Sequence, residues 1–365
     1  MPDVTTTIEA TAAGTRRGTR ASGPARRWLP VLVMAVAVVL ALLAAEAAAR
    51  VFFPQWAPRT GRVTQFWQYD ARYGWAHVPG STGVFESYGI HAPVTINAKG
   101  YRGPDVPYAR TPGRPRVVVL GDSYVWGFGV PERDMFTARL QEGIPGLEIV
   151  NLGVSGYGTD QELLLYRDEG RRYRADAVMV VVAVNDLASI MERTESVIYG
   201  KPHFVLDDQG GLTLENYPVA QTPLFKRVLV RMAWQSYLLT QVHRRLADRS
   251  GGPIAALRDE PDRVFPRSDA EKLLVRLLGQ MHADVVADGS RLLVVLVDGF
   301  GPQGEAIARY LAERGTPSVV LDRTLQDSDP TVHLPDGFHW NAIGHERVAR
   351  VLADRLADVG IKGES

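Results

Sequence analysis

Short apolar runs alternate with helix-like segments from Arg116 onward, and this alternation constrains the fold more than any other feature of the chain. The expected strands are RVVVL (116–120), LEIVN (147–151), AVMVVVAV (177–184), RLLVVLV (291–297) and SVVLD (318–322). The expected helices, where apolar residues recur at helical spacing, lie at 135–144, 158–174, 268–288, 302–314 and 342–357. Such an alternation predicts an α/β fold whose parallel sheet is covered by helices on both faces.

The alternating part forms one expected domain at 113–360, interrupted by an insertion at about 190–265. Within the insertion, KPHFVLDDQGGLTLENYPV has the pattern of a hairpin with its turn at 207–211, and a helix is expected at 224–247. Residues 50–112 are rich in proline, glycine and aromatic residues and predict a strand-and-loop lead-in that packs on the domain.

A membrane anchor is predicted at 28–49. Residues 28–45 read WLPVLVMAVAVVLALLAA without a charge, and the continuation gives the roughly 20 residues that cross a bilayer as a helix. Arginines cluster just before this stretch, at positions 16, 17, 20, 26 and 27. The positive-inside rule therefore places the tail 1–27, which has a disordered composition, in the cytoplasm and the main domain outside it. A buried core helix and a cleaved signal peptide are the alternatives; the long tail and the length of the apolar stretch favour a single-pass anchor.

Composition excludes several classes of function. The chain has 41 basic and 41 acidic side chains, so no net field attracts nucleic acid, and we expect none to bind. It has no cysteine, which removes disulfides, thiol catalysis and thiolate metal sites. Its histidines and acids are not paired at metal-ligand spacing, so we expect neither a metal nor another cofactor.

Ser123 is the candidate nucleophile. It lies in VVVLGDSYVWG, just after the end of an expected strand, where parallel α/β sheets carry their ligand-binding loops. A serine hydroxyl needs a base, an orienting acid and donors for the oxyanion. The GDS sequence alone fits a strand-to-helix turn with a capping serine equally well.

His339 is the candidate base and Asp336 the candidate acid. Both lie in LPDGFHWN, a turn ahead of an amphipathic helix, where Asp336 can accept the Nδ1 proton and leave Nε2 to take the serine proton. The same residues also fit a plain turn with Asn341 as a helix N-cap. The competing histidines are weaker, because His345 lies inside the expected helix and His333 has no suitably spaced acid.

Two further strand ends supply candidate oxyanion donors, the backbone N–H of Gly153 and the side-chain amide of Asn185. One such donor contributes about 2.7–4 kcal/mol to the transition state. Each residue also has an ordinary explanation as turn or cap chemistry. Aromatic rings next to the nucleophile and base, those of Tyr124, Trp126 and Trp340, are expected to line the cleft, although rings are also core material.

Four motifs together resemble the four blocks of the SGNH, or GDSL-type, hydrolase family and occur in its order: GDS (121–123), NLG (151–153), VND (184–186) and DGFH (336–339). The resemblance covers about 115–358. It implies a flavodoxin-like three-layer α/β/α fold, with Ser123 as nucleophile and donor through its own N–H, Gly153 and Asn185 as further donors, and Asp336 with His339 completing the triad. Two positions depart from the family pattern, with Ala183 in place of a glycine and Tyr124 in place of a leucine.

Other segments resemble particular branches of this family or related enzymes. VTINAKGYRGPD and GYGTDQELLLY are similar to the membrane-anchored bacterial branch, whose members are often encoded with surface-polysaccharide machinery. DGFHWN is similar, with one extra residue, to the DxHW segment of alginate-type O-acetyltransferases. The expected substrate is an acylated carbohydrate or a lipid-like ester, and the reaction is either hydrolysis or acyl transfer, which share an acyl-enzyme. A non-catalytic glycan-binding member of the fold is the third hypothesis.

Overall fold

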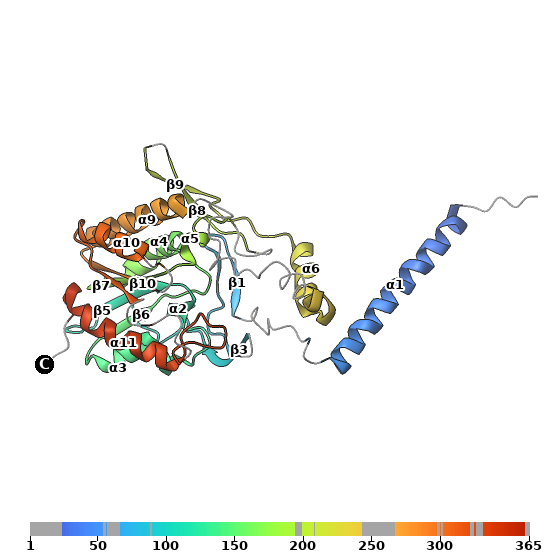
Figure 1. The fold of residues 1–365 in the computed structure, drawn as a ribbon, viewed down its shortest axis with the longest axis horizontal. Coiled ribbons are helices and arrows are strands. Elements are labelled where there is room, and N and C mark those ends of the chain that lie inside the picture. The colour runs from blue at the N-terminus through green and yellow to red at the C-terminus, as the bar shows by residue number, and fades with distance from the viewer. Residues whose placement is uncertain are drawn as a thin grey trace, which may run out of the picture. The chain divides into compact units, whose positions relative to one another are not determined.

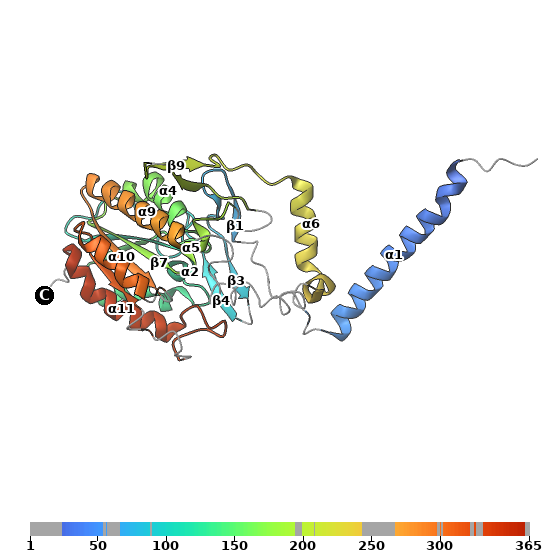
Figure 2. The same ribbon diagram turned by 45° about the horizontal axis from the view of Figure 1, so that its top comes forward.

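A five-stranded, fully parallel sheet forms the centre of the main domain in the computed structural model (Figures 1 and 2). In chain order its strands are β5 (Arg116–Gly121), β6 (Glu148–Asn151), β7 (Ala177–Ala183), β10 (Arg291–Val297) and β11 (Ser318–Val320). Their spatial order is β11-β10-β7-β5-β6, which is the flavodoxin-like order 2-1-3-4-5 read from the other edge. The predicted fold class is confirmed.

The structure describes most of the chain. The described residues are 24–53, 56, 66–87, 90–193, 199–207, 209–242, 267–297, 300, 302–321, 325 and 331–361. The predicted tail lies outside these residues up to position 23.

Helices cover both faces of the sheet and complete three layers, as Figure 1 shows. One face carries α3 (Phe136–Gly143) and α11 (Ala342–Leu356), and the other carries α4 (Thr159–Asp168), α9 (Arg267–Ala287) and α10 (Pro302–Ala312). Short 3₁₀ turns occur at Glu132–Asp134, Gly170–Tyr173 and Ala357–Val359.

Alternate residues of each central strand belong to different cores. In β7, Val178, Val180 and Val182 pack under α4 and α9, while Met179 and Val181 pack under α3 and α11. Every residue of this strand is buried. A strand buried on both sides has no solvent-facing position, which explains why the sequence run is continuously apolar. Full burial of each such side chain stabilises the fold by about 1.5–3 kcal/mol.

The lead-in consists of two antiparallel hairpins, β1 (Trp67–Asp70) with β2 (Gly74–His77), and β3 (Thr82–Ser87) with β4 (Ile90–Thr95). An aromatic cluster joins these hairpins to the loop after β5. Phe85 packs edge-on against Trp126 and Phe128, with ring centroids 5.1 and 4.9 Å apart. The lead-in therefore supports the turn that carries Ser123.

The insertion follows the short helix α5 (Asp186–Ser189). It contains the hairpin of β8 (His203–Leu206) and β9 (Leu212–Glu215) and then α6 (Leu224–Gln235). The expectation of one helix over 224–247 is wrong at Ser236. There the side-chain oxygen accepts a hydrogen bond from Leu239 N, so the serine starts a second short helical segment. The end of the predicted helix, beyond 242, lies outside the described residues.

The N-terminal helix α1 (Pro24–Phe52) forms a compact unit of its own. The stretch Trp28–Phe52 of this helix is long and apolar enough to cross a membrane. Its most apolar part is not buried among the described residues. The helix begins inside the predicted tail, at Pro24, because proline suits the first turn of a helix. Its exposed apolar side chains disagree with the alternative of a buried core helix.

Candidate active site

The expected site residues follow three neighbouring strands of the sheet. Ser123 comes after β5, Gly153 after β6 and Asn185 after β7, and β5 lies between the other two. The connection after β5 runs to β6 at one edge of the sheet, whereas the connection after β7 leads to β10 on the other side. The gap between β5 and β7 is therefore the topological switch point, where open α/β sheets bind ligands.

The sharp turn after β5 is made by Gly121 and Asp122. A side chain at Gly121 would lie 2.3 Å from Val125 Cγ2, so only glycine fits there. Asp122 caps the short helix α2 (Ser123–Trp126) by accepting a hydrogen bond from Tyr124 N at 3.0 Å. Ser123 is consequently the first residue of the helix, where backbone N–H groups have no partner within the helix.

Ser123, His339 and Asp336 form a continuous hydrogen-bonded chain. Ser123 Oγ lies 2.8 Å from His339 Nε2, and His339 Nδ1 lies 2.7 Å from Asp336 Oδ2. With the Nδ1 proton donated to the carboxylate, Nε2 is left to accept the serine proton. The structure thus brings together three residues that the sequence predicted as one catalytic unit.

Asp336 is held as an anion. Burial raises the pKa of its carboxyl, but the bond to His339 and the N–H groups of Phe338 and His339 outweigh burial, and the net pKa lies below its ordinary value. Phe128 also holds the His339 ring, because the two rings stack face to face with their centroids 3.9 Å apart.

Asn185 lies next to the nucleophile turn and is held by Asp122. Its Nδ2 donates to Asp122 Oδ2 at 2.9 Å. Because an amide nitrogen carries two hydrogens, this bond leaves one available for an oxyanion. Burial raises the pKa of Asp122, while the donors Asn185 and Tyr124 N favour its charged form.

Gly153 does not present a free donor in this structure. Its N–H donates to Asn151 Oδ1 at 2.8 Å, so the predicted oxyanion role requires that bond to be shared or broken. A Cβ at this position would lie 2.5 Å from Trp126 N. Close backbone packing against α2 therefore explains the glycine without any catalytic role.

The three aromatic residues expected to line the cleft lie in the core instead. Trp126 and Trp340 are completely buried, and Tyr124 is 2% exposed and donates its hydroxyl to Phe338 O at 3.0 Å. The prediction is wrong because each ring has a packing partner below the site: Trp126 fills the lead-in cluster, and Tyr124 packs on Trp340 with centroids 4.5 Å apart.

Two supporting residues were missed by the sequence analysis. Asn151, the first residue of the NLG motif, donates to Val125 O at 2.9 Å and so ties β6 to α2. Arg102, from the quoted GYRGPD segment, donates to Trp126 O and Gly127 O at 2.9 and 2.7 Å. Burial lowers the pKa of Arg102 to about 10, so it stays charged at neutral pH while it satisfies the carbonyls at the end of α2.

The competing residues have structural roles. Asn341 caps α11 by accepting from Ile343 N and Gly344 N, as the alternative interpretation of the turn predicted. His345 is buried and accepts from Phe136 N through Nδ1 at 3.2 Å. Neither role conflicts with the hydrogen-bonded chain.

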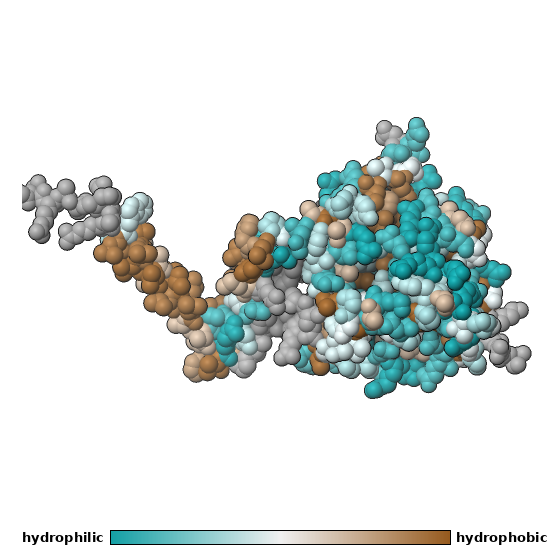
Figure 3. All heavy atoms as spheres, turned by 180° about the vertical axis from the view of Figure 1, so that it is seen from behind, coloured by the Kyte–Doolittle hydropathy of each residue, from teal (hydrophilic) through white to brown (hydrophobic). Residues whose placement is uncertain are grey.

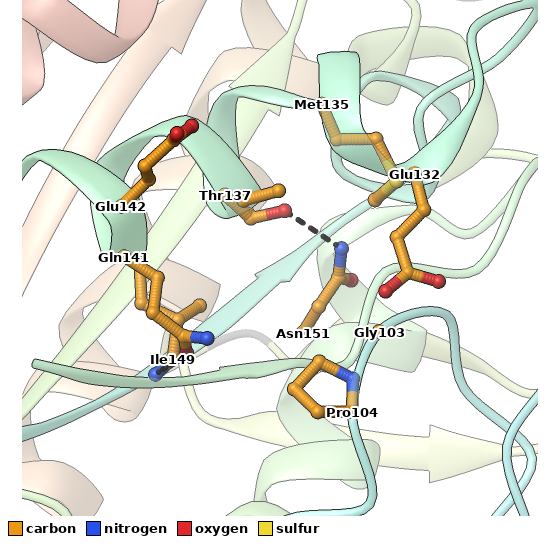
Figure 4. Close-up of a pocket in the computed structure, with 10 residues that line it drawn as sticks. Gly103, Pro104, Glu132, Met135, Thr137, Gln141, Glu142, Ile149 and Asn151 are labelled. Atoms are coloured by element: carbon orange, nitrogen blue, oxygen red, sulfur yellow. Dashed lines mark hydrogen bonds between the residues drawn. The ribbon is translucent and has the colours of Figure 1, made fainter.

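A hollow is lined by residues of the lead-in (Gly103 and Pro104), of α3 and of β6. In Figure 4, Thr137 and Asn151 point toward each other across it, with 3.2 Å between the hydroxyl and the amide nitrogen. Glu132 and Glu142 also line it, whereas Ser123 and His339 do not. The hollow is separate from the hydrogen-bonded chain.

Buried charged side chains surround α5, the helix that follows Asn185. Lys201, from the insertion, donates to Asp160 Oδ1 at 3.0 Å and to Ser189 O at 2.6 Å, and both charged side chains are fully buried. Asp186 accepts from Ala183 N and Thr159 N. These contacts hold both ends of α5, the helix that Asn185 precedes. Among the described residues, no three histidines or acids are arranged to hold a metal ion.

The model of the GDSL-like lipase/acylhydrolase family matches residues 119–347, well over half of the chain. The chain belongs to this family. The family description names lipases and acylhydrolases, which is consistent with an esterase. None of the curated proteins compared with the chain matches it.

Solved structures with a similar chain path are distant in sequence. TesA is 15% identical, with 67% of this chain and 99% of that chain covered and a TM-score of 0.39. The esterase EstA from a Pseudoalteromonas species is 10% identical, with 66% and 97% covered and a score of 0.38. A GDSL-like lipase from Bacteroides thetaiotaomicron is 12% identical, with 68% and 90% covered and a score of 0.38. The family assignment rests on the sequence match.

Proposed function

We propose that the protein is a membrane-anchored serine esterase in which Ser123 is the nucleophile, His339 the general base and Asp336 the orienting acid. The observation that carries the proposal is the hydrogen-bonded chain from Ser123 Oγ through the imidazole to Asp336, with links of 2.8 and 2.7 Å. This arrangement supplies what an unactivated serine hydroxyl lacks at neutral pH.

The first half-reaction forms an acyl-enzyme. Ser123 Oγ attacks the ester carbonyl carbon as His339 Nε2 takes the hydroxyl proton, and the imidazolium then gives that proton to the leaving alcohol as its C–O bond breaks. In the second half, His339 takes a proton from water, the hydroxide attacks the acyl carbon, and Oγ leaves and regains a proton. The Ser123 N–H and the second amide hydrogen of Asn185 stabilise the oxyanion in both steps.

The proposed substrate is an acyl ester, in first place an acetyl ester, on a carbohydrate of the cell envelope, and the domain acts outside the cytoplasm. The support is the apolar stretch of α1, the basic residues that precede it, and the similarity of GYRGPD and GYGTDQELLLY to the membrane-anchored bacterial branch. Envelope polysaccharide machinery is the proposed functional partner.

A fluorophosphonate probe tests the serine assignment on the full-length protein in detergent. We expect one modification, mapped to Ser123 by mass spectrometry, and none in Ser123→Ala. Ser155, on the neighbouring loop after β6, provides a matched serine control, because Ser155→Ala should label like the wild type. A folded wild-type protein that the probe does not label would overturn the catalytic assignment.

A second assay distinguishes water from a sugar as the acyl acceptor. An O-acetylated polysaccharide is incubated with the protein, with and without an unacetylated oligosaccharide, and both free acetate and newly acetylated sugar are measured. Hydrolysis predicts acetate release that does not depend on the acceptor. Acetylated oligosaccharide formed at the expense of acetate would identify an O-acyltransferase that uses the same acyl-enzyme.

A further inference from the structure

Exposed apolar side chains concentrate in one segment of the insertion. Of the eleven large hydrophobic residues that are exposed after residue 57, among those the structure describes, seven lie between Leu224 and Val242. They are Leu224, Phe225, Val228, Leu229, Met232, Leu239 and Val242, and the other four are Val84, Tyr217, Val286 and Ile343. Figure 3 shows apolar surface gathered on α6. Scattered apolar residues are normal on a surface, but a cluster indicates a binding face.

The five large apolar residues of α6 that are exposed among the described side chains share one side of the helix. The spacing of Leu224, Phe225, Val228, Leu229 and Met232 is i, i+1, i+4, i+5 and i+8, which covers a single helical face. They are between 47% and 69% exposed, so this face has no covering partner among the described residues. Lys226 and Arg227 fall on the two flanks of the opposite face at 100° per residue.

The same segment is purely basic. From Asn216 to Ala247 the sequence has no aspartate or glutamate, although the whole chain has equal numbers of acidic and basic residues. The basic residues of this segment are Lys226, Arg227, Arg231, Arg244 and Arg245. An apolar face flanked by basic residues on a helix of low overall hydrophobicity is typical of helices that lie in the interface of an anionic bilayer.

We propose that α6 docks on an anionic membrane surface, with its apolar face inserted at the boundary of headgroups and acyl chains and with Lys226 and Arg227 beside the lipid phosphates. Their long aliphatic stems allow the charges to reach the headgroups while the helix lies in the interface. A second copy of this chain fits the face less well, because two α6 helices packed together would bring like charges together.

The chain's own anchor places the bilayer within reach. Fourteen residues, 53–66, separate the end of α1 from the start of β1. Fully extended, they span at most roughly 50 Å. This argument rests on the proposed anchorage through α1. If α1 is anchored, docking of α6 on the same membrane is an intramolecular event, and the effective concentration of lipid near α6 is high.

The absence of cysteine from the chain makes a site-specific test direct, since a single introduced cysteine is the only labelling site. Leu229→Cys, on the apolar face, carries a nitroxide in the full-length protein reconstituted into liposomes. Val286→Cys, on α9, and Val84→Cys, on β3, are the matched controls, because both replace exposed apolar residues outside α6. Electron paramagnetic resonance then compares access of each label to oxygen, which enters the bilayer, and to an aqueous nickel chelate.

With phosphatidylglycerol in the liposomes, we expect the Leu229 label to lose access to the nickel chelate several-fold relative to both controls and to gain access to oxygen. Pure phosphatidylcholine should weaken this difference. Equal nickel access at all three positions in anionic liposomes would overturn the proposal. Protection of the Leu229 label that persists in detergent and rises with protein concentration would also overturn it, because such protection identifies a second copy of the chain as the partner. Alkaline extraction of the same liposomes tests the α1 anchor separately, and circular dichroism reports that each variant is folded.

Discussion

The side-chain amide of Asn185 donates to the fully buried carboxylate of Asp122 at 2.9 Å. These residues belong to two different motifs, GDS and VND, which lie on neighbouring strands. Asp122 also fixes Tyr124 N at the start of α2. One carboxylate therefore sets both the position of the nucleophile helix and the direction of the proposed oxyanion donor.

Asp122 is predicted to act on turnover through Asn185. Asn185→Ala should lower kcat for p-nitrophenyl acetate by about 10²–10³ with little change in KM, because it removes an oxyanion donor. Asp122→Ala should lower kcat by a similar order and also destabilise the fold by about 1 kcal/mol through the lost cap. If the effect passes through Asn185, the double variant has nearly the kcat of Asn185→Ala alone. Multiplicative losses would assign Asp122 an independent role.

Asp336→Asn is expected to lower kcat by about 10⁴ while the protein stays folded. An asparagine still accepts the N–H bonds of Phe338 and His339, so the turn persists, but it cannot stabilise the imidazolium or select the correct tautomer. The measurement is steady-state kinetics together with circular dichroism. The exposed Glu346→Gln, on α11, is the control and should leave kcat unchanged. Near-normal turnover in Asp336→Asn would remove this residue from the mechanism.

Lys201→Met is predicted to destabilise the protein by about 3–5 kcal/mol, because it leaves Asp160 without its cation in a dry interior. Adding Asp160→Asn should recover part of this loss, since the uncompensated charge is then gone. Urea unfolding of the wild type and the three variants provides the double-mutant cycle. A double variant less stable than Lys201→Met would show that the ion pair is not the dominant interaction of Lys201, which also donates to Ser189.

Much of the fold was predictable because it depends on local pattern. The doubly buried strands β5, β7 and β10 are continuous apolar runs, and their observed bounds lie within one residue of the predicted ones. The juxtaposition of Ser123 with His339, 216 positions apart, was predictable only from the motifs, because no periodicity connects them. Their catalytic roles stay a prediction.

The parts that the sequence did not reveal depend on tertiary packing. Trp126 and Trp340 adjoin the site in sequence, but whether a ring faces solvent or core depends on what packs against it, here the lead-in hairpins and α3. Whether the Gly153 N–H is free or donates a hydrogen bond to Asn151 Oδ1 depends on the side-chain conformation of Asn151. The support of α2 by Arg102 requires a long-range contact that no spacing predicts.

Glu162 gives a pH-dependent prediction. It is fully buried, neither carboxylate oxygen has a hydrogen-bond partner in the described part of the chain, and burial together with the nearby carboxyls of Asp186 and Asp122 raises its pKa well above the ordinary value. The folded protein therefore keeps a proton that the unfolded chain releases above about pH 4.5. Folding stability contributed by this proton is complete below that pH and is lost as the pH rises toward the folded-state pKa.

Glu162→Gln abolishes this proton linkage without changing the size of the side chain. The free energy of unfolding of the variant, relative to wild type, should rise with pH above 4.5 by up to about 1.4 kcal/mol per pH unit. Urea titrations between pH 5 and 8 measure the difference, and Glu142→Gln, an exposed residue of α3, should show no such trend. If the free energy of unfolding of Glu162→Gln relative to wild type does not change across this pH range, Glu162 is ionised in the folded protein. Its charge would then add to those of the buried carboxylates near Lys201, the cation of the buried ion pair.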